Sequence, residues 1–469
     1  MTKSQTNFAW ATLLDTGTTA GPAHERLATA LRTAIRDGRL VEGDAVPPSR
    51  ALAEELGCSR WVVTEAYGQL TAEGYLAGRV GSATRVAWIP GTDGPRQRGP
   101  AVRDRHPVRY DLAPGLPDLR AFPRHRWARA VSDAIAAAVH DDLGPPDPAG
   151  HPALRRTLSG YLRRSRGADL RSATVTVCAG ITDGLVRVCR ALRSAGITQL
   201  AVEDPGWTRL HQAAANTGIG VHPMPVDDDG LRVGDLPACG GVRAVVVGAA
   251  HQFPTGTVLS PPRRTELVRW ARAVDGFVVE DDYDAEFRYD RRPVAVVQGM
   301  DPGRVFLLGS VSKTLSPALG LGWLVAPGAL ASAVRSANAV APAPPVLDQL
   351  ALASFIDRGW YDAHLRAARR RFRARRDLLV ETLTAQLPEG RIAGTAAGLH
   401  LLLHLPDGTD TAAAVTAAAA SGLRLMDLAG YRSGRSGTPA LVIGYGNISA
   451  AEIPPAVALL RHAVTSPAG

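Results

Sequence analysis

The alternation of apolar and polar positions near the amino terminus predicts three short helices. Apolar residues recur at three- and four-residue intervals, and a glycine ends each segment: Leu27, Leu31 and Ile35 before Gly38; Leu52 and Leu56 before Gly57; Val63, Ala66, Tyr67 and Leu70 before Gly74. Ser59 can cap the third helix, and Gly57-Cys58 separates it from the second, which is typical of a helix-turn-helix. Two short β-type runs around residues 79–82 predict a hairpin with a basic tip. The first unit is therefore expected to be a winged helix-turn-helix, mostly α.

Beyond Tyr110 the pattern changes to short apolar runs that alternate with helical segments. The strand-like runs cover residues 174–177, 200–203, 244–247, 277–280 and 305–308, and helical segments such as 184–192, 207–216 and 265–274 lie between them. This βαβ alternation implies a parallel-rich sheet covered on both faces. After Pro345 a long arginine-rich helical stretch, 348–387, leads into mixed segments.

These patterns predict three parts. Residues 12–87 form the winged helix-turn-helix, and residues 88–108 form a linker rich in proline, glycine and arginine. Residues 109–469 form an α/β domain, whose smaller C-terminal α+β subdomain begins at about residue 346.

Composition narrows the class of protein. A chain of 469 residues is too long to fold around one ordinary hydrophobic core. Its composition, 45% apolar and 21% charged residues, is typical of a soluble globular protein. No apolar run reaches the roughly 18 residues of a membrane span, and the start of the chain lacks the pattern of a secretion signal, so we expect a cytoplasmic protein. The four cysteines are far apart, and we predict no metal site. The net charge of +9 permits polyanion binding, although a genome bias towards arginine would give the same charge.

The predicted chemistry centres on Lys313. Lysine occurs only at Lys3 and Lys313, and Lys313 follows the apolar run 305–308. It should therefore lie on the turn after the carboxyl end of a buried strand, where open α/β sheets bind ligands. Asp281 and Tyr283 follow another strand, and the alternation of side chains points both to one side. The simpler alternative is a surface lysine, with an acid and a phenol that only cap a strand and a turn.

A third element of this chemistry is the segment 178–183, which passes from a strand into a helix. It presents backbone N–H groups suited to a phosphate. An amine, an acid, a phenol and a phosphate cradle are what pyridoxal 5′-phosphate requires: the amine forms a Schiff base, the acid keeps the ring nitrogen protonated and the phenol donates to the ring oxygen. The sequence therefore predicts a pyridoxal phosphate site.

Residues 37–87, DGRLVEGDAVPPSRALAEELGCSRWVVTEAYGQLTAEGYLAGRVGSATRVA, resemble the DNA-binding domain of the GntR family. The resemblance implies binding to double-stranded DNA, with Arg50 and Arg60 at the starts of the second and recognition helices and the wing near Gly81 at the groove edge. Helix amino termini and guanidinium groups both favour phosphate, and arginine can also read guanine.

The same resemblance adds Ser59, Trp61 and Thr64 to the expected DNA-binding residues. The chain departs from the family pattern at residues 46–49, Val-Pro-Pro-Ser, where the family usually has a Leu-Pro-Ser type run. It departs again at Ala83, where a second wing glycine is common. The alternative for this unit is a dimerisation or protein-docking domain.

Residues 110–455 resemble fold-type I aminotransferases, and the two parts together resemble the MocR subfamily of GntR regulators. The shared phrases are YDLAPGLPDLRAFPRHRW, DPAGHPALR, EDPGW, HQFPTG, EDDYDAEFRY, GSVSKTLSPAL and AGLHLLL. The resemblance implies an α/β aminotransferase-like domain and assigns Lys313 to the cofactor's aldehyde, Asp281 to its ring nitrogen and Tyr283 to its ring oxygen. The remaining cofactor-binding residues that it implies are Ser310, Thr182 and Ile181 around the phosphate and Phe253 beside the ring. Phe253 stands where catalytic aminotransferases usually have an asparagine.

Three departures bear on the bound groups. Gly320 stands where the family usually has an arginine that grips the phosphate, and loss of a charge-assisted contact costs about 1.5–3 kcal/mol. Val442 stands where aminotransferases hold an arginine for the substrate carboxylate, which argues against an amino-acid effector anchored there. Arg209, two residues after Trp207, matches an effector-binding arginine of a related regulator, so the resemblance implies Trp207 and Arg209 as effector-binding residues; an ordinary exposed arginine is the alternative for Arg209. Ile181 replaces a small or hydroxyl residue of the phosphate loop, which leaves more to Thr182 and the backbone.

The resulting hypothesis is a transcriptional regulator that binds DNA and pyridoxal phosphate and responds to an effector, which is an amine, an amino acid or pyridoxal phosphate itself. The resemblance implies a head-to-tail, domain-swapped homodimer that reads paired half-sites. One alternative is an active aminotransferase carrying a DNA-binding domain. Another is a regulator that has lost its cofactor.

Overall fold

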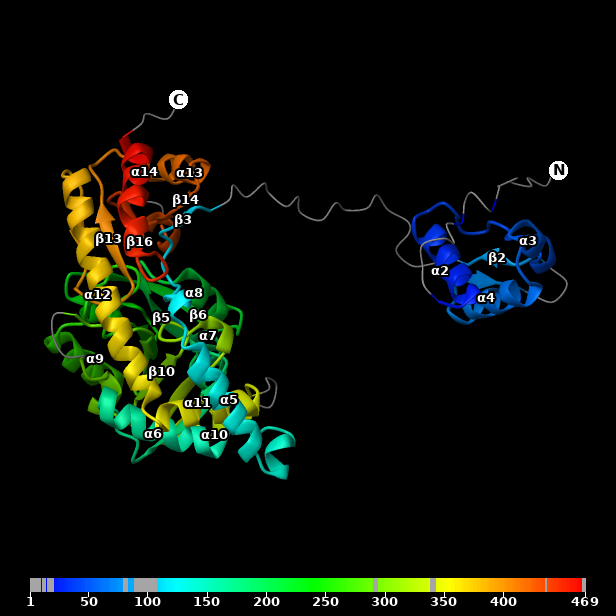
Figure 1. Cartoon of the computed structure of the whole chain (residues 1–469). Helices are drawn as coiled ribbons and strands as arrows, with labels where there is room; N and C mark the ends of the chain where they lie inside the picture. Colours follow the sequence, from blue (N-terminus) through cyan, green and yellow to red (C-terminus); the bar gives the residue numbers. More distant parts are fainter. Residues whose placement is uncertain are drawn as a thin grey trace. The chain divides into compact units, whose positions relative to one another are not determined.

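The computed structural model describes residues 10, 14, 21–78, 83–87, 108–289, 294–337, 343–434 and 437–465. The chain divides into two compact units, residues 1–104 and 105–469 (Figure 1). The predicted linker, apart from Val108, and Gly81 of the predicted wing lie outside the described residues. Among the described helices, none has both the length and the apolar character needed to span a bilayer.

The described part of the first unit is mostly helical, with a short hairpin. Its elements are α2 (Ala23–Arg36), α3 (Ser49–Glu55), α4 (Arg60–Ala72), β1 (Leu76–Ala77) and β2 (Arg85–Val86). The apolar faces predicted from the spacing form its core, with Leu31, Leu52 and Leu70 fully buried. β1 pairs antiparallel with β2, with Leu76 opposite Val86. The helix-turn-helix and the stem of the wing are therefore confirmed.

The second unit is built on an eight-stranded sheet. In spatial order its strands are β4 (Ala173–Cys178), β11 (Gly322–Pro327), β10 (Val305–Ser310), β9 (Phe277–Asp282), β8 (Ala244–Val247), β5 (Gln199–Asp204), β6 (Gly220–Asp227) and β7 (Gly230–Leu231). Strands β10, β9, β8, β5 and β6 are mutually parallel, whereas β11 runs antiparallel to both of its neighbours. The five predicted strands are all present, and β11 inserts between two of them.

Side-chain alternation along β10 shows how the sheet is covered. Phe306 and Leu308 pack into a core with α7 (Ile181–Ser194) and α8 (Thr208–Ala215). Leu307 faces the other side, into a core built largely by α6 (Pro152–Arg166) and α11 (Val346–Asp357). The sheet is thus buried on both faces, as its apolar strands require.

A smaller four-stranded antiparallel sheet belongs to the same unit. Its strand order is β12 (Arg391–Ala393), β13 (His400–His404), β16 (Ala440–Gly444) and β15 (Met426–Asp427). The helices α12 (Trp360–Gln386), α13 (Thr411–Ala420) and α14 (Ile453–Thr465) share one core with it (Figure 1).

The helical stretch predicted over 348–387 is two helices. Gly359 has φ +69° between α11 and α12, a left-handed conformation that favours glycine and ends the first helix. Side chains of α11 such as Phe355 pack with the larger sheet, so the core of the smaller subdomain takes its helical side chains from α12 onward. The predicted start of the smaller subdomain, residue 346, is the first residue of α11.

Candidate functional site

In the first unit, the turn between α3 and α4 is fixed by local backbone chemistry. Gly57 has φ +62° at the end of α3. The Ser59 hydroxyl accepts a hydrogen bond from the Val62 amide at 3.4 Å and so caps α4. Buried Val63 and Leu70 anchor α4 in the core, which leaves its other face open to solvent.

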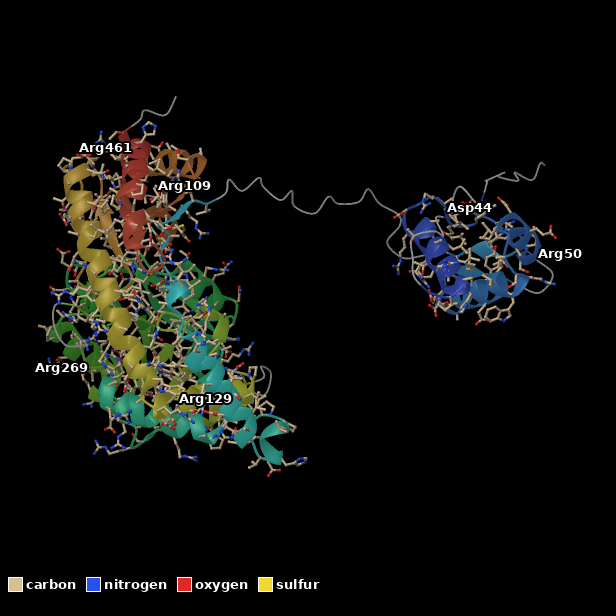
Figure 2. All side chains as sticks on the ribbon, viewed as in Figure 1. Asp44, Arg50, Arg109, Arg129, Arg269 and Arg461 are labelled. Atoms are coloured by element: carbon tan, nitrogen blue, oxygen red, sulfur yellow. The ribbon has the colours of Figure 1, made fainter. Side chains whose placement is uncertain are left out.

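The predicted DNA-binding side chains lie on that open side. Arg60 Nε donates to the Ser49 hydroxyl at 3.3 Å, which links the starts of the two helices. Arg50 is 82% exposed and projects from the surface of α3, where it forms an ion pair with Glu54 of the same helix (Figure 2). Trp61 is 61% exposed, so its side chain is available for contacts outside the domain. Thr64 is exposed one turn further along α4.

In the second unit, the carboxyl ends of three parallel strands surround one cavity. Its lining residues are Val202, Glu203, Gly206, Trp207, Leu210, His211, Val246, Gly248, Phe253, Asp281 and Tyr283. Asp281 and Tyr283 thus share one side, and Phe253 and Trp207 face the same space. Arg209 is exposed on α8 and is not among these lining residues, so its role as an effector contact stays a prediction.

The three consecutive acids of β9 have different surroundings. Glu280 accepts hydrogen bonds from the amides of Val297 and Gln298, and Asp282 accepts two from the buried guanidinium of Arg166, each at 2.7 Å. Asp281 lines the cavity instead, and its Oδ1 is buried without a hydrogen-bond partner in the described part of the chain. Burial, followed by the charges of Asp282 and Asp284, raises the pKa of Asp281 to about 7.

That unpartnered oxygen is the strongest test of fit for pyridoxal phosphate. A protonated pyridine nitrogen would donate to Asp281 Oδ1 and supply the positive charge that the buried carboxylate lacks. The residues present therefore fit the group at the point where its charge matters most.

Lys313 lies on the turn that follows β10. Its Nζ donates to the carbonyl of Gly115 at 2.5 Å, and burial lowers its pKa, while the carboxylates of Asp284 and Asp281 raise it. The next residue, Thr314, is held from α12: Tyr361 bonds its hydroxyl at 2.9 Å and His364 its carbonyl at 2.7 Å. The electrostatic effect that Lys313 and Asp281 have on each other's pKa indicates that the amine lies near the acid predicted to share its site, although Lys313 is not among the residues that line the cavity.

The segment predicted to bind the phosphate leads into α7. Gly180 has φ +119°, and the next backbone N–H groups, including those of Ile181 and Thr182, have no partner within the helix. Gly322 pairs with both Ser310 and Cys178 across the sheet, and a Cβ on Gly322 would approach Gly180 Cα to 2.7 Å. The end of β10 and the start of α7 are thus brought together, and only glycine permits it.

The individual residues of this region differ in what they can offer. The Ile181 side chain packs in the core, so its backbone N–H is its available group, whereas Thr182 is exposed. Gly320 has φ +56°, and a Cβ there would meet nothing within 4 Å. Arg187 is 1% exposed on α7 and pairs with Asp183 at 2.8 Å, a buried cation near the loop that the sequence did not reveal.

A histidine cluster beside Tyr283 was also missed. The Tyr283 hydroxyl lies 3.1 Å from Nδ1 of His251, and both carboxylate oxygens of Asp284 lie 3.0 Å from the same nitrogen. His400, from the smaller sheet, has its ring centroid 4.9 Å from that of His251 and 5.0 Å from that of Phe253. The sequence did offer a signal. The acid–phenol–acid run 282–284 follows one predicted strand, and His251 follows the predicted strand before it.

The position predicted to lack a carboxylate anchor lies in an apolar cluster. Val442 of β16 is fully buried, and it packs in a cluster with the buried side chains of Leu402 and Tyr431. The partly buried Trp207 and Phe253 pack against this cluster. The Phe253 and Tyr431 rings meet edge to face, with centroids 5.0 Å apart.

Comparison with known proteins agrees with both units. Residues 112–426 match the aminotransferase class I and II family, and residues 23–86 match the bacterial regulatory proteins of the gntR family. The protein named Probable rhizopine catabolism regulatory protein MocR, from Rhizobium meliloti, is 32% identical over 464 residues, with 94% of each chain covered. The HTH-type pyridoxine biosynthesis transcriptional regulator PdxR of Corynebacterium glutamicum is 31% identical, covering 90% of this chain and 91% of that protein.

Solved structures show the same fold for the second unit. A multiple substrate aminotransferase from Thermococcus profundus superposes with a TM-score of 0.70 at 23% identity, covering 76% of this chain and 91% of its own. With a family match over most of the chain and relatives that match both units in order, the chain belongs to the MocR subfamily of the GntR regulators, in which a winged helix-turn-helix precedes an aminotransferase-like domain.

Proposed function

We propose that this protein is a DNA-binding transcriptional regulator whose aminotransferase-like domain binds pyridoxal phosphate and senses a small effector. The observation that carries the proposal is the buried, unpartnered Oδ1 of Asp281 in a cavity with Tyr283, next to Lys313. When bound, pyridoxal phosphate supplies an aldehyde that primary amines attack reversibly. Lys313 is the amine of this chain that would hold it.

The other residues would orient the cofactor. Asp281 would accept the ring N–H, Tyr283 would donate to the ring oxygen, and Trp207 and Phe253 would cover the ring. The phosphate would lie among Ser310, Thr182 and the N–H groups at the start of α7, where the helix dipole favours an anion.

The DNA would be bound by Arg50, Ser59, Arg60, Trp61 and Thr64, with the wing at Gly81. Two copies in a cytoplasmic, head-to-tail, domain-swapped homodimer would read paired half-sites, and effector binding would shift the dimer between states of different DNA affinity. Support comes from the exposed face of α4 and from the relatives, which are named as HTH-type regulators.

Reductive trapping tests the cofactor assignment sharply, because the chain has only two lysines. The purified protein is loaded with pyridoxal phosphate, reduced with borohydride and digested for mass spectrometry. We expect the adduct on Lys313, its loss in Lys313→Ala, and its retention in the matched control Lys3→Ala. Adduct on Lys3 alone, or no visible absorbance after loading, would refute the proposal.

An active aminotransferase is the second candidate, because Lys313 and Asp281 would serve catalysis equally well. Phe253 and Val442 argue against it, since the site lacks a polar ring contact and a carboxylate anchor at these positions. Incubation with a panel of amino and oxo acids distinguishes the two: sustained conversion at enzyme-like rates would favour the enzyme.

A further inference from the structure

The second helix of the helix-turn-helix, α4, carries an indole at the centre of its open face. The buried residues of α4 are Val63, Ala66, Tyr67 and Leu70, and with about 3.6 residues per turn Trp61 falls on the opposite side of the helix. Trp61 is the second residue of α4 and is 61% exposed. In a helix-turn-helix, the amino-terminal part of this helix reaches the base edges in the major groove. The indole therefore lies where α4 is expected to meet DNA.

His24 limits the positions that this indole can take. The ring of His24, the second residue of α2, meets the Trp61 ring edge to face, with centroids 5.3 Å apart and planes at 69°. A side chain that is fixed in advance loses less conformational freedom when a partner binds, so more of its contact free energy contributes to affinity. Trp61 is therefore an exposed apolar side chain with a defined orientation.

The residues around Trp61 separate two kinds of contact with DNA. Arg50 and Arg60, in the first turns of α3 and α4, carry the positive charge that binds phosphate. Glu65, one turn after Trp61, is exposed, and its carboxylate repels phosphate. Gly68, two turns after Trp61, is exposed as well, and a Cβ there would meet nothing within 4 Å. The centre of this face thus offers an apolar ring, a carboxylate and open space, which match base edges better than the sugar-phosphate backbone.

The apolar group that the major groove presents is the methyl group of thymine. The other base edges present hydrogen-bond donors and acceptors there. An indole has one N–H donor, and the rest of its surface is apolar, so thymine is the base that it matches best. Burial of one methyl group against the ring corresponds to about a fourfold gain in affinity.

We propose that Trp61 is a specificity-determining residue, and that its indole, held by His24, packs against the methyl group of a thymine in the operator. The proposal rests on the proposed function, since it requires that α4 binds DNA. It assigns to Trp61 the reading of one base, whereas Arg50 and Arg60 hold the protein on the duplex through its phosphates. Operator sites are then expected to share a thymine at the position that faces Trp61.

Replacement of thymine by uracil tests this contact, because it removes the methyl group and keeps every hydrogen-bonding group of the base. The protein's own upstream region is prepared once with thymine and once with uracil at every thymine position. Gel retardation with the full-length protein measures both affinities at one salt concentration. We expect the wild type to bind the thymine DNA at least threefold more tightly, and Trp61→Ala to lose most of this preference. No preference in the wild type, or an undiminished preference in Trp61→Ala, overturns the proposal.

Further variants separate the apolar contact from other roles of the indole. Trp61→Phe keeps an apolar ring without the N–H donor and should retain part of the thymine preference, and His24→Ala should reduce that preference less than Trp61→Ala does. Arg60→Ala should weaken binding to both DNAs by a similar factor and keep the preference. Val41→Ala, at another exposed apolar residue of this unit, should bind like the wild type. An indole N–H that bonds a phosphate would instead leave Trp61→Phe as weak as Trp61→Ala on both DNAs, which overturns the proposal.

The same experiment keeps this inference apart from the proposed function. Retardation of neither DNA by the folded wild-type protein would overturn the proposed function. Normal DNA binding without a preference for thymine would overturn this inference alone. Gel filtration of Trp61→Ala covers the remaining role of the indole: a changed oligomeric state together with an intact thymine preference would assign Trp61 to a protein contact and overturn the inference.

Discussion

Both carboxylate oxygens of Asp284 lie 3.0 Å from Nδ1 of His251, and both side chains are 2% exposed. The Tyr283 hydroxyl is 3.1 Å from the same nitrogen. One ring nitrogen carries at most one proton, so when Nδ1–H is donated to Asp284 no lone pair is left there for the Tyr283 proton. The phenol then remains able to donate to a cofactor oxygen. The pair thus keeps Tyr283 available for the role proposed for it.

Asp284→Asn should disturb this arrangement. The introduced amide can donate to Nδ1 of His251, which favours the His251 tautomer that carries its proton on Nε2. We expect the pH midpoint of the visible absorbance of the loaded protein to move by about one unit. Asp377→Asn, at a 58% exposed carboxylate on α12, is the matched control and should leave it in place. The same midpoint in both variants would show that Asp284 does not influence the titration of the bound cofactor.

Gly320→Arg should tighten cofactor binding. A Cβ at this position meets nothing within 4 Å, but φ +56° costs a non-glycine residue about 1–2 kcal/mol. A charge-assisted contact with the phosphate contributes about 1.5–3 kcal/mol, so a modest net gain in affinity is expected. Fluorescence titration of the cofactor-free protein with pyridoxal phosphate measures it. Gly240→Arg, at an exposed glycine away from the site, controls for added charge. Weaker binding in Gly320→Arg would show that the phosphate does not lie here.

Asp281 should make the cofactor-free protein less stable as the pH rises. Its folded-state pKa of about 7 exceeds its ordinary value, so the folded state binds the proton more tightly, and this contribution to stability is lost as the pH rises from about 4 to about 7. Asp281→Asn should flatten that slope and raise the free energy of unfolding at pH 7 by roughly 1–4 kcal/mol while weakening cofactor binding. Urea unfolding between pH 5 and pH 8 measures it, with exposed Asp407→Asn as control. An unchanged slope would indicate a solvated Asp281.

Arg60→Ala should weaken binding to the protein's own upstream DNA. If Arg60 contacts a phosphate, the affinity falls by a similar factor for every DNA sequence. The plot of log affinity against log salt concentration also becomes less steep, by about one. Arg461→Ala removes the same charge from α14 of the other unit and should bind DNA normally (Figure 2). Equal retardation of the wild type and Arg60→Ala would contradict the assignment.

The fold was largely predictable, because apolar spacing reports helices and strands directly. Lys313, Asp281 and Tyr283 were predicted as one site because the carboxyl ends of parallel strands meet at one edge. His400 could not be predicted in the same way, since it begins a strand of the smaller sheet, and nothing in the spacing shows where the two sheets meet. β11 was missed because Gly322 and Pro327 bound its apolar run and suggest a loop. The break at Gly359 was missed because a single glycine is tolerated within a helix.

Fluorescence anisotropy can measure the DNA affinity of the protein in three states: cofactor-free, loaded with pyridoxal phosphate, and loaded with ethanolamine added. If the cofactor and the effector regulate DNA binding, at least one state differs from the others by fivefold or more, the range of ordinary allosteric coupling. The difference should disappear in Lys313→Ala and persist in Lys3→Ala. The same DNA affinity in all three states of the wild-type protein would contradict this regulation.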